Sequence, residues 1–597
     1  MSVHATVLLA YLAAGIAVNW TRAAYLTGHV LPTGRDAGLF VWDYWWIARS
    51  VVHLSNPWFS HYLAAPAGVP LGFHVLMPLP GVLMTPVTLA YGPSVTYNLL
   101  TALAPGLMCY TMYRAARLWV PSQTGAIAGG AFYGLSTMMT WNAWFEIQLA
   151  LGAIYLPLAL EAAVRLGRRP GWRQAVILGV VLGTALLTDL ESSIMTGIVV
   201  IAALLPWLAR TAAPGGERAW TKLRLAGLAA AVTAVIASPQ LTATAQQALA
   251  GDASVPQGAL AADYRSSGAA LQQIFAPSPR VGAFGLKSLA AYYYRSGPHS
   301  ATFTAYGVVL TTLALFGLVV CWRRRSARLL GLFWLGATWL ALGTGILIGN
   351  HRYVPLAQVW HGERLSMIMP YTWMVRISLL SSFREADRIT ELGLVAAALL
   401  AAAAVNWLRY HARPVLAVAL ALGVLEAGSA GAAASPQVTA TIPAALPALD
   451  RPIAADHSGS IVVDVPLGVR GAVPLPDEGA AFDPEAEVQA TADGHPRAVA
   501  YISRLPESIL AAVKRHPFYG DLLDAQREPG VVYHELRASR AHPAWLAAAR
   551  LDARRMHVGW AIVWSATPEI LNYLRAAGFQ FGYRAGGALV YRLGPRA

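Results

Sequence analysis

Long apolar runs recur along the chain between residues 3 and 428, and short polar segments separate them. Most runs approach the length of about 20 residues with which an α-helix crosses the hydrocarbon core of a bilayer. They predict membrane spans at 3–20, 96–113, 125–140, 149–164, 175–187, 193–208, 225–239, 306–322, 329–348, 392–407 and 415–428. A further run, 75–91, is broken by prolines and is consistent with either a kinked span or a re-entrant segment. The fold class expected is therefore a polytopic α-helical membrane protein with about 11 to 12 hydrophobic segments.

The pattern of apolar and polar residues changes after residue 434, where no further run is apolar enough to span. Residues 461–467 and 557–564 are typical of buried strands. Thr567 and Pro568 predict a helix start, Gly578 predicts its end, and Gly586 with Gly587 predicts a hairpin turn. We expect a membrane domain over 1–434, with a long first outer loop at 21–74, and a small α/β domain over 435–597. Two other long outer segments are expected at 242–303 and 349–390.

Composition supports the membrane assignment. Only 12% of the 597 residues are charged and 56% are hydrophobic, whereas an average soluble domain carries about 25% charged residues. The net charge of +14 does not indicate nucleic acid, because the arginines lie in the gaps between apolar runs rather than on one soluble face. Cys109 and Cys321 have no metal-ligand spacing around them, so neither a disulfide framework nor a zinc site is expected. The run 3–18 has no basic segment before it, so we expect it to be retained as a span rather than cleaved.

The positive-inside rule gives an orientation. Arginine clusters at 114–117, 165–173, 210–224, 323–328 and 409–413 fall on one side if the spans alternate, and most acidic residues fall on the other. We therefore expect a multi-pass protein of the cytoplasmic membrane, with the C-terminal domain outside the cytoplasm.

Two acids mark the first outer loop. Asp36 and Asp43 are seven residues apart, which places both on one face of a helix beside Trp42, Trp45 and other aromatics. A poorly solvated carboxylate at the interface has a raised basicity and is suited to accept a proton from an alcohol. The alternative is a pair of solvated, inert acids on an interfacial helix.

A second group of acids interrupts apolar chain at the outer ends of spans. Asp189 and Glu191 do so in LLTDLES, and Glu146 does so in WFEIQL. Burying an ionised carboxylate in lipid costs at least about 2.5 kcal/mol, so we expect these groups either to face a water-filled cavity or to pair with an arginine of another helix.

Three arginines are candidate phosphate ligands. Arg384 and Arg388, in SSFREADR, are one helical turn apart and are expected to project together as a fork for a phosphate. Arg376 is a further candidate. The alternative is neutralisation by neighbouring acids, namely Glu385, Asp387 and Glu391.

Other site chemistry is weakly indicated. His61 and His74 flank a proline- and glycine-containing segment without a recognisable metal motif, and we treat them as loop residues, with His74 retained among the candidate substrate contacts. No phosphate-binding loop, dinucleotide fingerprint or nucleophile elbow occurs in a credible setting.

Several segments together resemble a known family. GRDAGLFVWDYWW, NPWFSHYLAAPAGVPLGFH, GPSVTYNLLTAL, LLTDLES and SSFREADR, with IVVDVPL in the later domain, resemble the bacterial polytopic glycosyltransferases of the GT-C type. The resemblance implies a transferase that moves a sugar from a polyprenyl-phosphate donor to an acceptor of the cell envelope outside the cytoplasmic membrane, usually with inversion. It also implies that the lipid bilayer and the lipid-linked donor are partners and that nucleic acid is not.

The resemblance assigns roles to individual residues. Asp36 stands where such proteins carry the catalytic base. Asp43 is less typical there and is assigned as a helper or a metal contact, which leaves a divalent metal open as a cofactor. Glu191 aligns with an acid often seen in such proteins. Trp42 and Trp45 are candidates to stack on the apolar face of the sugar, and anchoring at the membrane interface is the alternative. The WFEIQL stretch replaces a histidine-containing one, so the role of Glu146 is a departure from the pattern.

Two other functions stay open from the sequence. Buried acids and arginines also mark the pathways of transporters and lipid flippases, although these favour charges at the midplane rather than at the outer surface. An inactive relative that binds a lipid-linked glycan as a scaffold has the same sequence features.

Overall fold

The structure is a computed structural model, and it describes residues 2–30, 35–209, 219–252, 261, 264–265, 267–275, 305–348, 351–377, 380, 383–434, 442–472, 484–527 and 543–594. These residues form two compact units. Unit 1 comprises 1–24, 98–239 and 260–439, and unit 2 comprises 25–97, 240–259 and 440–597. The predicted first outer loop therefore folds together with the C-terminal segment. The domain boundary expected at residue 434 had placed these two segments in different domains.

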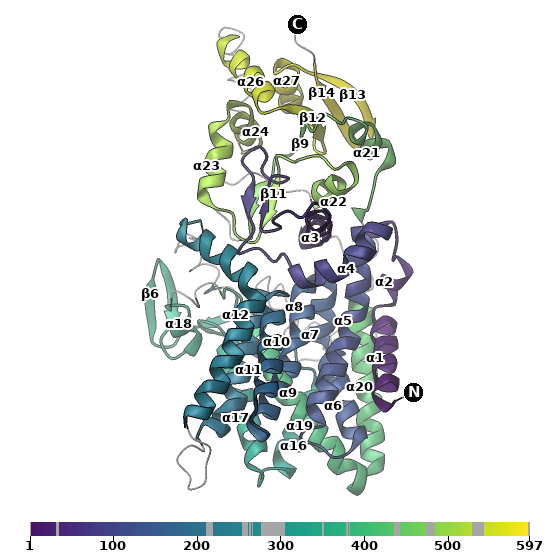
Figure 1. Cartoon of the computed structure of the whole chain (residues 1–597), viewed down its shortest axis with the longest axis vertical. Helices are drawn as coiled ribbons and strands as arrows, with labels where there is room; N and C mark the ends of the chain where they lie inside the picture. Colours follow the sequence, from purple (N-terminus) through teal and green to yellow (C-terminus); the bar gives the residue numbers. More distant parts are fainter. Residues whose placement is uncertain are drawn as a thin grey trace. The chain divides into compact units, whose positions relative to one another are not determined.

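Unit 1 is helical (Figure 1). Its helices are α1 (Val3–Val18), α2 (Trp20–Ala24), most of α5 (Pro93–Ala116), α6 (Gln123–Gly134), α7 (Thr137–Phe145), α8 (Ile147–Ala153), α9 (Tyr155–Arg168), α10 (Trp172–Leu186), α11 (Leu190–Leu208), the larger part of α12 (Ala219–Leu249), α14 (Leu271–Ile274), α16 (Val308–Val320), α17 (Arg325–Ala341), α18 (Pro370–Met374), the 3₁₀ helix η3 (Ala386–Ile389), α19 (Thr390–His411) and α20 (Arg413–Ala434).

Four stretches of the described chain are long and apolar enough to cross a membrane: Ile147–Arg168, Leu190–Leu208, Ala219–Leu249 and Ala386–His411. Shorter apolar helices occur at Val3–Val18, Trp172–Leu186 and Val308–Val320. The expectation of a polytopic α-helical membrane protein is confirmed.

Helix α19 is the centre of unit 1, where it packs against α6, α16 and α17. Its row of alanines allows neighbouring backbones to approach closely, as is common between helices in membranes. At the crossing with α16, a Cβ added to Gly317 would lie only 2.0 Å from the carbonyl oxygen of Leu400. A glycine is therefore required where the two helices touch.

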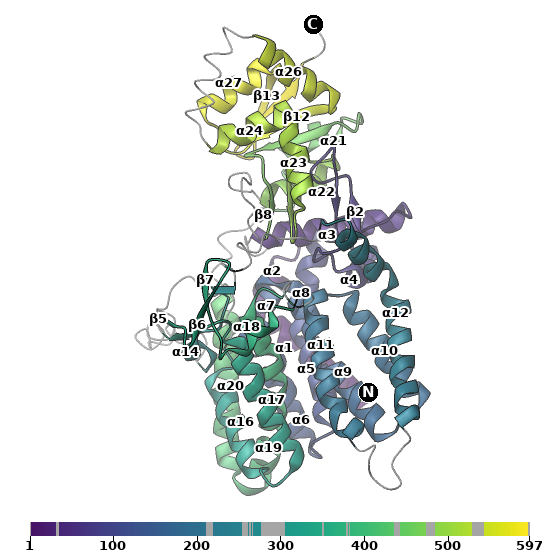
Figure 2. The same ribbon diagram turned by 90° about the vertical axis from the view of Figure 1, so that its left-hand side faces the viewer.

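Two predicted spans of unit 1 are wrong in their extent. The span 125–140 is divided into α6 and α7, because the Ser136 hydroxyl accepts the N–H of Met139 and starts a new helix. The span 329–348 ends early, since α17 stops at Ala341. The following residues form strand β4 (Ile346–Ile348), which pairs with β5 (His351–Tyr353). A second hairpin, β6 (Ala357–Trp360) with β7 (Glu363–Ser366), follows, and Figure 2 shows both hairpins beside α18.

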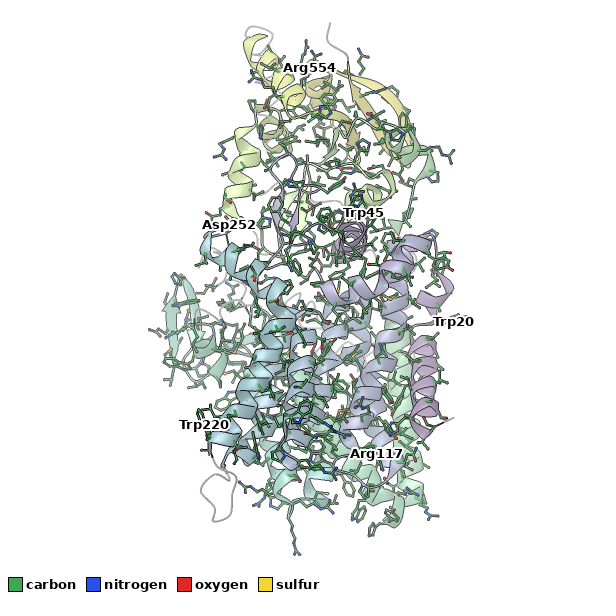
Figure 3. All side chains as sticks on the ribbon, viewed as in Figure 1. Trp20, Trp45, Arg117, Trp220, Asp252 and Arg554 are labelled. Carbon is green, nitrogen blue, oxygen red and sulfur yellow. The ribbon has the colours of Figure 1, made fainter. Side chains whose placement is uncertain are left out.

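Arginine clusters sit at matching helix ends of unit 1. Arg114 near the end of α5 and Arg165 near the end of α9 both bind Glu161, at 3.0 Å and 2.7 Å. Arg168 donates to the carbonyl of Leu118 at 3.0 Å. In Figure 3, Arg117 and Trp220 lie toward the end of the helices away from Trp20. Direct contacts thus join two of the clusters that the positive-inside rule assigns to one side of the membrane, namely 114–117 and 165–173.

Unit 2 contains a four-stranded sheet in the order β13–β14–β12–β9. Strand β9 (Ile461–Val465) pairs in parallel with β12 (Val558–Val563), and β13 (Phe579–Ala585) and β14 (Ala588–Leu593) form an antiparallel hairpin. Helix α27 (Pro568–Ala576) begins at the Thr567 cap, so the strand, helix and hairpin predicted for this segment are confirmed. The described part of the C-terminal segment also contains the helices α21 (Pro447–Ala454), α22 (Pro484–Asp493), α23 (Glu507–Arg515), α24 (Pro517–Arg527) and α26 (Pro543–Arg555).

The first loop is joined to the C-terminal segment within unit 2. It forms β1 (His29–Val30), α3 (Arg35–Val52), β2 (Phe59–Ser60) and β3 (Val69–Pro70), and α4 (Pro78–Tyr91) follows it. The N–H groups of Ala64 and Ala65 donate to the carbonyls of Val499 and Arg497, at 3.0 Å and 2.9 Å. Helix α3 also packs against α4 and α22, and β1 pairs with β8 (Ile442–Pro443). With 14 residues, α4 is too short to cross a bilayer of about 30 Å as a straight helix.

Candidate functional site

Helix α3 carries both acids of the first loop, as predicted, but places them in different environments. Asp36 lies in the first turn and is partly exposed, whereas Asp43 is completely buried. An acid in the first turn is favoured by the positive end of the helix dipole. Of the two carboxylates, Asp36 is the one that keeps access to solvent.

Asp43 is bound to His74. The Nε2 atom of His74 lies 3.0 Å from Oδ1 of Asp43, and both side chains are buried. The backbone N–H of Ser503 donates to Nδ1 of His74 at 3.1 Å. Because Nδ1 accepts that bond, the proton of a neutral imidazole is on Nε2, which therefore donates to Asp43. His74 is thus a buried ring that links α3 to the C-terminal segment.

Burial raises the pKa of Asp43, while the charge and the hydrogen bond of His74 act in the opposite direction. The second oxygen of Asp43 has no hydrogen-bond partner among the described residues. This environment suits a carboxylate that fixes a neighbour more than one that exchanges protons with a substrate.

The surroundings of Asp36 come from the C-terminal segment. Strands β10 (Val469–Gly471) and β11 (Ala500–Ile502) pair in parallel, with Arg470 opposite Tyr501. The hydroxyl of Tyr501 hydrogen-bonds to Asp36, and the guanidinium of Arg470 lies 5.0 Å from the centre of the Tyr501 ring. Burial raises the pKa of Tyr501, and the charge of Asp36 raises it further.

A buried acid supports this arrangement from α22. The Oε1 atom of Glu487 accepts the backbone N–H of Tyr501 at 3.1 Å, and the side chain of Glu487 has no exposed surface. Burial, followed by the charges of Asp43 and Asp36, raises the pKa of Glu487 well above its usual range. Burial therefore favours the protonated, uncharged form of Glu487 beside Asp36.

The tryptophans of α3 stack mainly on other protein groups. Trp42 is buried and stacks on Trp46 with ring centres 5.7 Å apart. Trp45, labelled in Figure 3, lies against Tyr62 at 5.5 Å and has the Arg49 guanidinium 5.7 Å from its ring centre. Trp45 is the more exposed of the two predicted sugar-stacking residues.

Unit 1 brings four of the other predicted residues together. The Nη1 atom of Arg388 is 2.5 Å from Oε2 of Glu191, and Nη2 is 3.7 Å from Oε1 of Glu146. The side chains are only 14% to 22% exposed. Asp189 lies next to this group as the N-cap of α11, where its carboxylate accepts the N–H of Ser192 at 2.7 Å. Arg388 is therefore bound by Glu191 of α11 and by Glu146 between α7 and α8.

The other two arginines are placed differently. Arg384 lies before η3 in a segment without helical structure, so the prediction that it shares a helical turn with Arg388 is wrong. Arg376 follows α18, where it lies 5.0 Å from the Trp373 ring centre and donates to Gln358 at 2.8 Å. The described residues contain no group of three or more His, Cys, Asp or Glu side chains arranged to hold a metal ion.

Sequence reasoning missed Tyr501, Arg470 and Glu487. Tyr501 reads as an ordinary buried strand residue in AVAYIS, and its relation to Asp36 depends on a pairing over more than 450 positions. Glu391, which was expected only to neutralise an arginine, instead accepts a bond from Asn142 at 2.7 Å.

Comparisons with known proteins place the fold. No protein-family model matches the chain. No curated protein matches it. Among solved structures, the cryo-EM structure of the arabinofuranosyltransferase AftD from mycobacteria aligns with 99% of this chain at a TM-score of 0.57 and 14% identity. The chain spans 40% of the AftD chain.

Two further structures align more loosely. ArnT from Cupriavidus metallidurans in the apo state aligns over all of both chains at 14% identity and a TM-score of 0.47. An oligosaccharyltransferase from Archaeoglobus fulgidus aligns over 93% of this chain and 67% of its own at 11% identity and a TM-score of 0.45. The likeness to AftD shows that the resemblance to GT-C-type proteins, drawn from sequence motifs, holds at the level of the fold.

Proposed function

We propose that this chain is a membrane glycosyltransferase that moves a sugar from a polyprenyl-phosphate donor to a hydroxyl of an acceptor outside the cytoplasmic membrane. The observation that carries the proposal is the fold, which the chain shares over nearly its whole length with an arabinofuranosyltransferase.

In the proposed reaction, Asp36 is the general base. Its carboxylate takes the proton of the acceptor hydroxyl as that oxygen forms a bond to the anomeric carbon of the sugar. The bond from the anomeric carbon to the phosphate oxygen breaks at the same time, and polyprenyl phosphate leaves with the electron pair. Partial exposure of Asp36, in contrast to the burial of Asp43 against His74, supports this choice of base.

The roles of the remaining predicted residues follow from their contacts. We propose that Asp43 and His74 hold α3 in place, that Glu191 and Glu146 orient Arg388, and that Asp189 caps α11. Binding of a donor phosphate by Arg388 requires displacement of at least one carboxylate. Arg376, Arg384 and Trp45 remain proposed contacts of substrate.

The test is a transfer assay with purified protein and a panel of radiolabelled polyprenyl-phosphate pentoses and hexoses, with envelope lipids and glycans as acceptors. Wild type should transfer label from at least one donor, and Asp36→Asn should lose most of that transfer. Asp252→Asn is the matched control, because it changes a carboxylate of unit 2 that accepts the hydroxyl of Ser508 at 2.8 Å and has no proposed role in the reaction. Absence of transfer by the wild type with every donor would contradict the proposal.

A further inference from the structure

Tyr501 and Arg470 form a cross-strand pair in unit 2, and the Tyr501 hydroxyl binds the carboxylate of Asp36. They occupy opposite positions of the parallel strands β10 and β11, and the Arg470 guanidinium lies 5.0 Å from the Tyr501 ring centre. A cation at this distance from an aromatic face is attracted to the ring and fixes its orientation. Tyr501 therefore has little freedom to rotate away from α3.

The backbone of Tyr501 is held as firmly as its ring. Glu487 accepts its N–H at 3.1 Å, and Glu487 belongs to α22, which packs directly against α3. The side chain of Glu487 is inaccessible, and the exposed fraction of Tyr501 is only 6%. The pair, α22 and α3 thus form one packed group around Asp36.

We infer that Tyr501 and Arg470 are positioning residues for Asp36: the Tyr501 hydroxyl donates a hydrogen bond to the carboxylate, and Arg470 fixes and polarises that hydroxyl. The inference rests on the proposed role of Asp36 as base. A hydrogen bond to the ionised form of a carboxylate stabilises that form and fixes which oxygen faces the substrate. The C-terminal segment then takes a direct part in the site.

Charged groups on the elements around α3 set the background for this effect. Asp43 lies on α3 itself, Glu487 and Asp493 lie on α22, His29 lies on β1, and Tyr91 lies on α4. Asp493 is bound to Arg497, Asp43 is bound to His74, and burial raises the pKa of Glu487. Tyr501 is hydrogen-bonded to Asp36 itself, and Arg470 lies on the Tyr501 ring, so these two residues are the ones to vary.

The test measures the titration of Asp36 without requiring turnover. Purified protein is treated with a carbodiimide and an amine over a range of pH, and labelling of Asp36 is followed by peptide mass spectrometry, since only the protonated carboxyl is activated. For Tyr501→Phe we expect the labelling midpoint to move up by about one pH unit, because a carboxylate that loses a charge-assisted donor binds its proton more tightly. Arg470→Met should shift the midpoint in the same direction by less.

Matched controls exist in the same unit. Tyr573→Phe removes a tyrosine–aspartate bond of 2.7 Å to Asp521, and Arg592→Met removes a guanidinium 5.0 Å from the Trp560 ring centre. Neither should move the midpoint at Asp36. An unchanged midpoint in a folded Tyr501→Phe variant, checked by size-exclusion chromatography, would overturn the inference.

A kinetic measurement separates this inference from the proposed function. With an active donor, Tyr501→Phe should lower kcat with little change in KM and move the acid limb of the kcat/KM profile to higher pH. Arg470→Lys should restore most of the rate lost in Arg470→Met. A wild type that transfers no sugar contradicts the glycosyltransferase proposal, whereas the labelling midpoint still decides the role of Tyr501 and Arg470.

Discussion

The imidazole of His74 and the carboxylate of Asp43 form a buried hydrogen bond of 3.0 Å in unit 2, and Ser503 fixes the tautomer of the ring from the other side. This contact ties the helix of the first loop to a residue more than 400 positions later. It also explains why one of the two acids of α3 is removed from solvent. We therefore propose a structural role for Asp43 and a catalytic role for Asp36.

The His74–Asp43 bond should be measurable as a coupling. Asp43→Ala and His74→Ala should each destabilise the protein, and the double variant should be less destabilised than the sum of the two by about 1.5–3 kcal/mol. The free energy of unfolding, measured in detergent, gives this coupling. Additive effects, within about 0.5 kcal/mol, would show that the two side chains do not depend on each other.

The Arg388 cluster should be more sensitive to loss of the cation than to loss of one acid. Arg388→Met leaves Glu191 and Glu146 close together without their shared cation, and we expect it to cost about 1–3 kcal/mol. Adding Glu191→Gln to Arg388→Met should recover part of that stability, because a neutral amide needs no cation. Comparison of thermal unfolding midpoints tests this, and a double variant less stable than Arg388→Met would contradict the assigned contacts.

Asp450 predicts a pH dependence of stability. Burial, which outweighs the bond from the N–H of Leu446, raises the pKa of Asp450 from 3.8 to about 6. The folded state thus binds the proton of Asp450 more tightly than the unfolded state does. Protonation therefore contributes its full free energy of folding below about pH 3.8, and this contribution is lost as the pH rises through about 6. Asp450→Asn should gain stability relative to wild type across that window, as measured by thermal unfolding. A constant difference between the two proteins over the same pH range would contradict the assignment.

The orientation makes a prediction about labelling in cells. In a variant without Cys109 and Cys321, a cysteine at the exposed Ser565 of unit 2 should react with a membrane-impermeant maleimide from outside. A cysteine at Arg325, the exposed first residue of α17, should react only after the membrane is opened. The reverse pattern would place the C-terminal segment in the cytoplasm and remove the extracytoplasmic site.

Local patterns accounted for much of the fold. The membrane class follows from apolar runs, and the end of the chain follows from Thr567, Pro568 and the glycine pair at the hairpin, because caps and turns are set by neighbouring residues. The extent of spans was harder to predict. The apolar residues 346–348 fit the hydrophobic pattern of a membrane span in the sequence, but in the structure they form strand β4, which pairs with β5.

The candidate site was predictable only in part. Asp36, Glu191 and Arg388 are unusual in their sequence context, since charged groups beside apolar runs require an explanation. The residues that contact the acids of α3 do not stand out in the sequence in this way. His74 was treated as a loop residue, and Tyr501 reads as strand core, because the contact of His74 with Ser503 and that of Tyr501 with Asp36 each join residues hundreds of positions apart. Pairings of this kind are set by tertiary packing rather than by any local period.

The most direct test of the account is the single-turnover rate of sugar transfer by Asp36→Asn, measured with a donor that the wild type uses and at saturating acceptor. If Asp36 is the base, the rate should fall by about 10²–10⁴-fold while the affinity for polyprenyl phosphate stays unchanged. A rate within a few-fold of wild type, in a variant that folds and binds the lipid normally, would show that another group removes the proton.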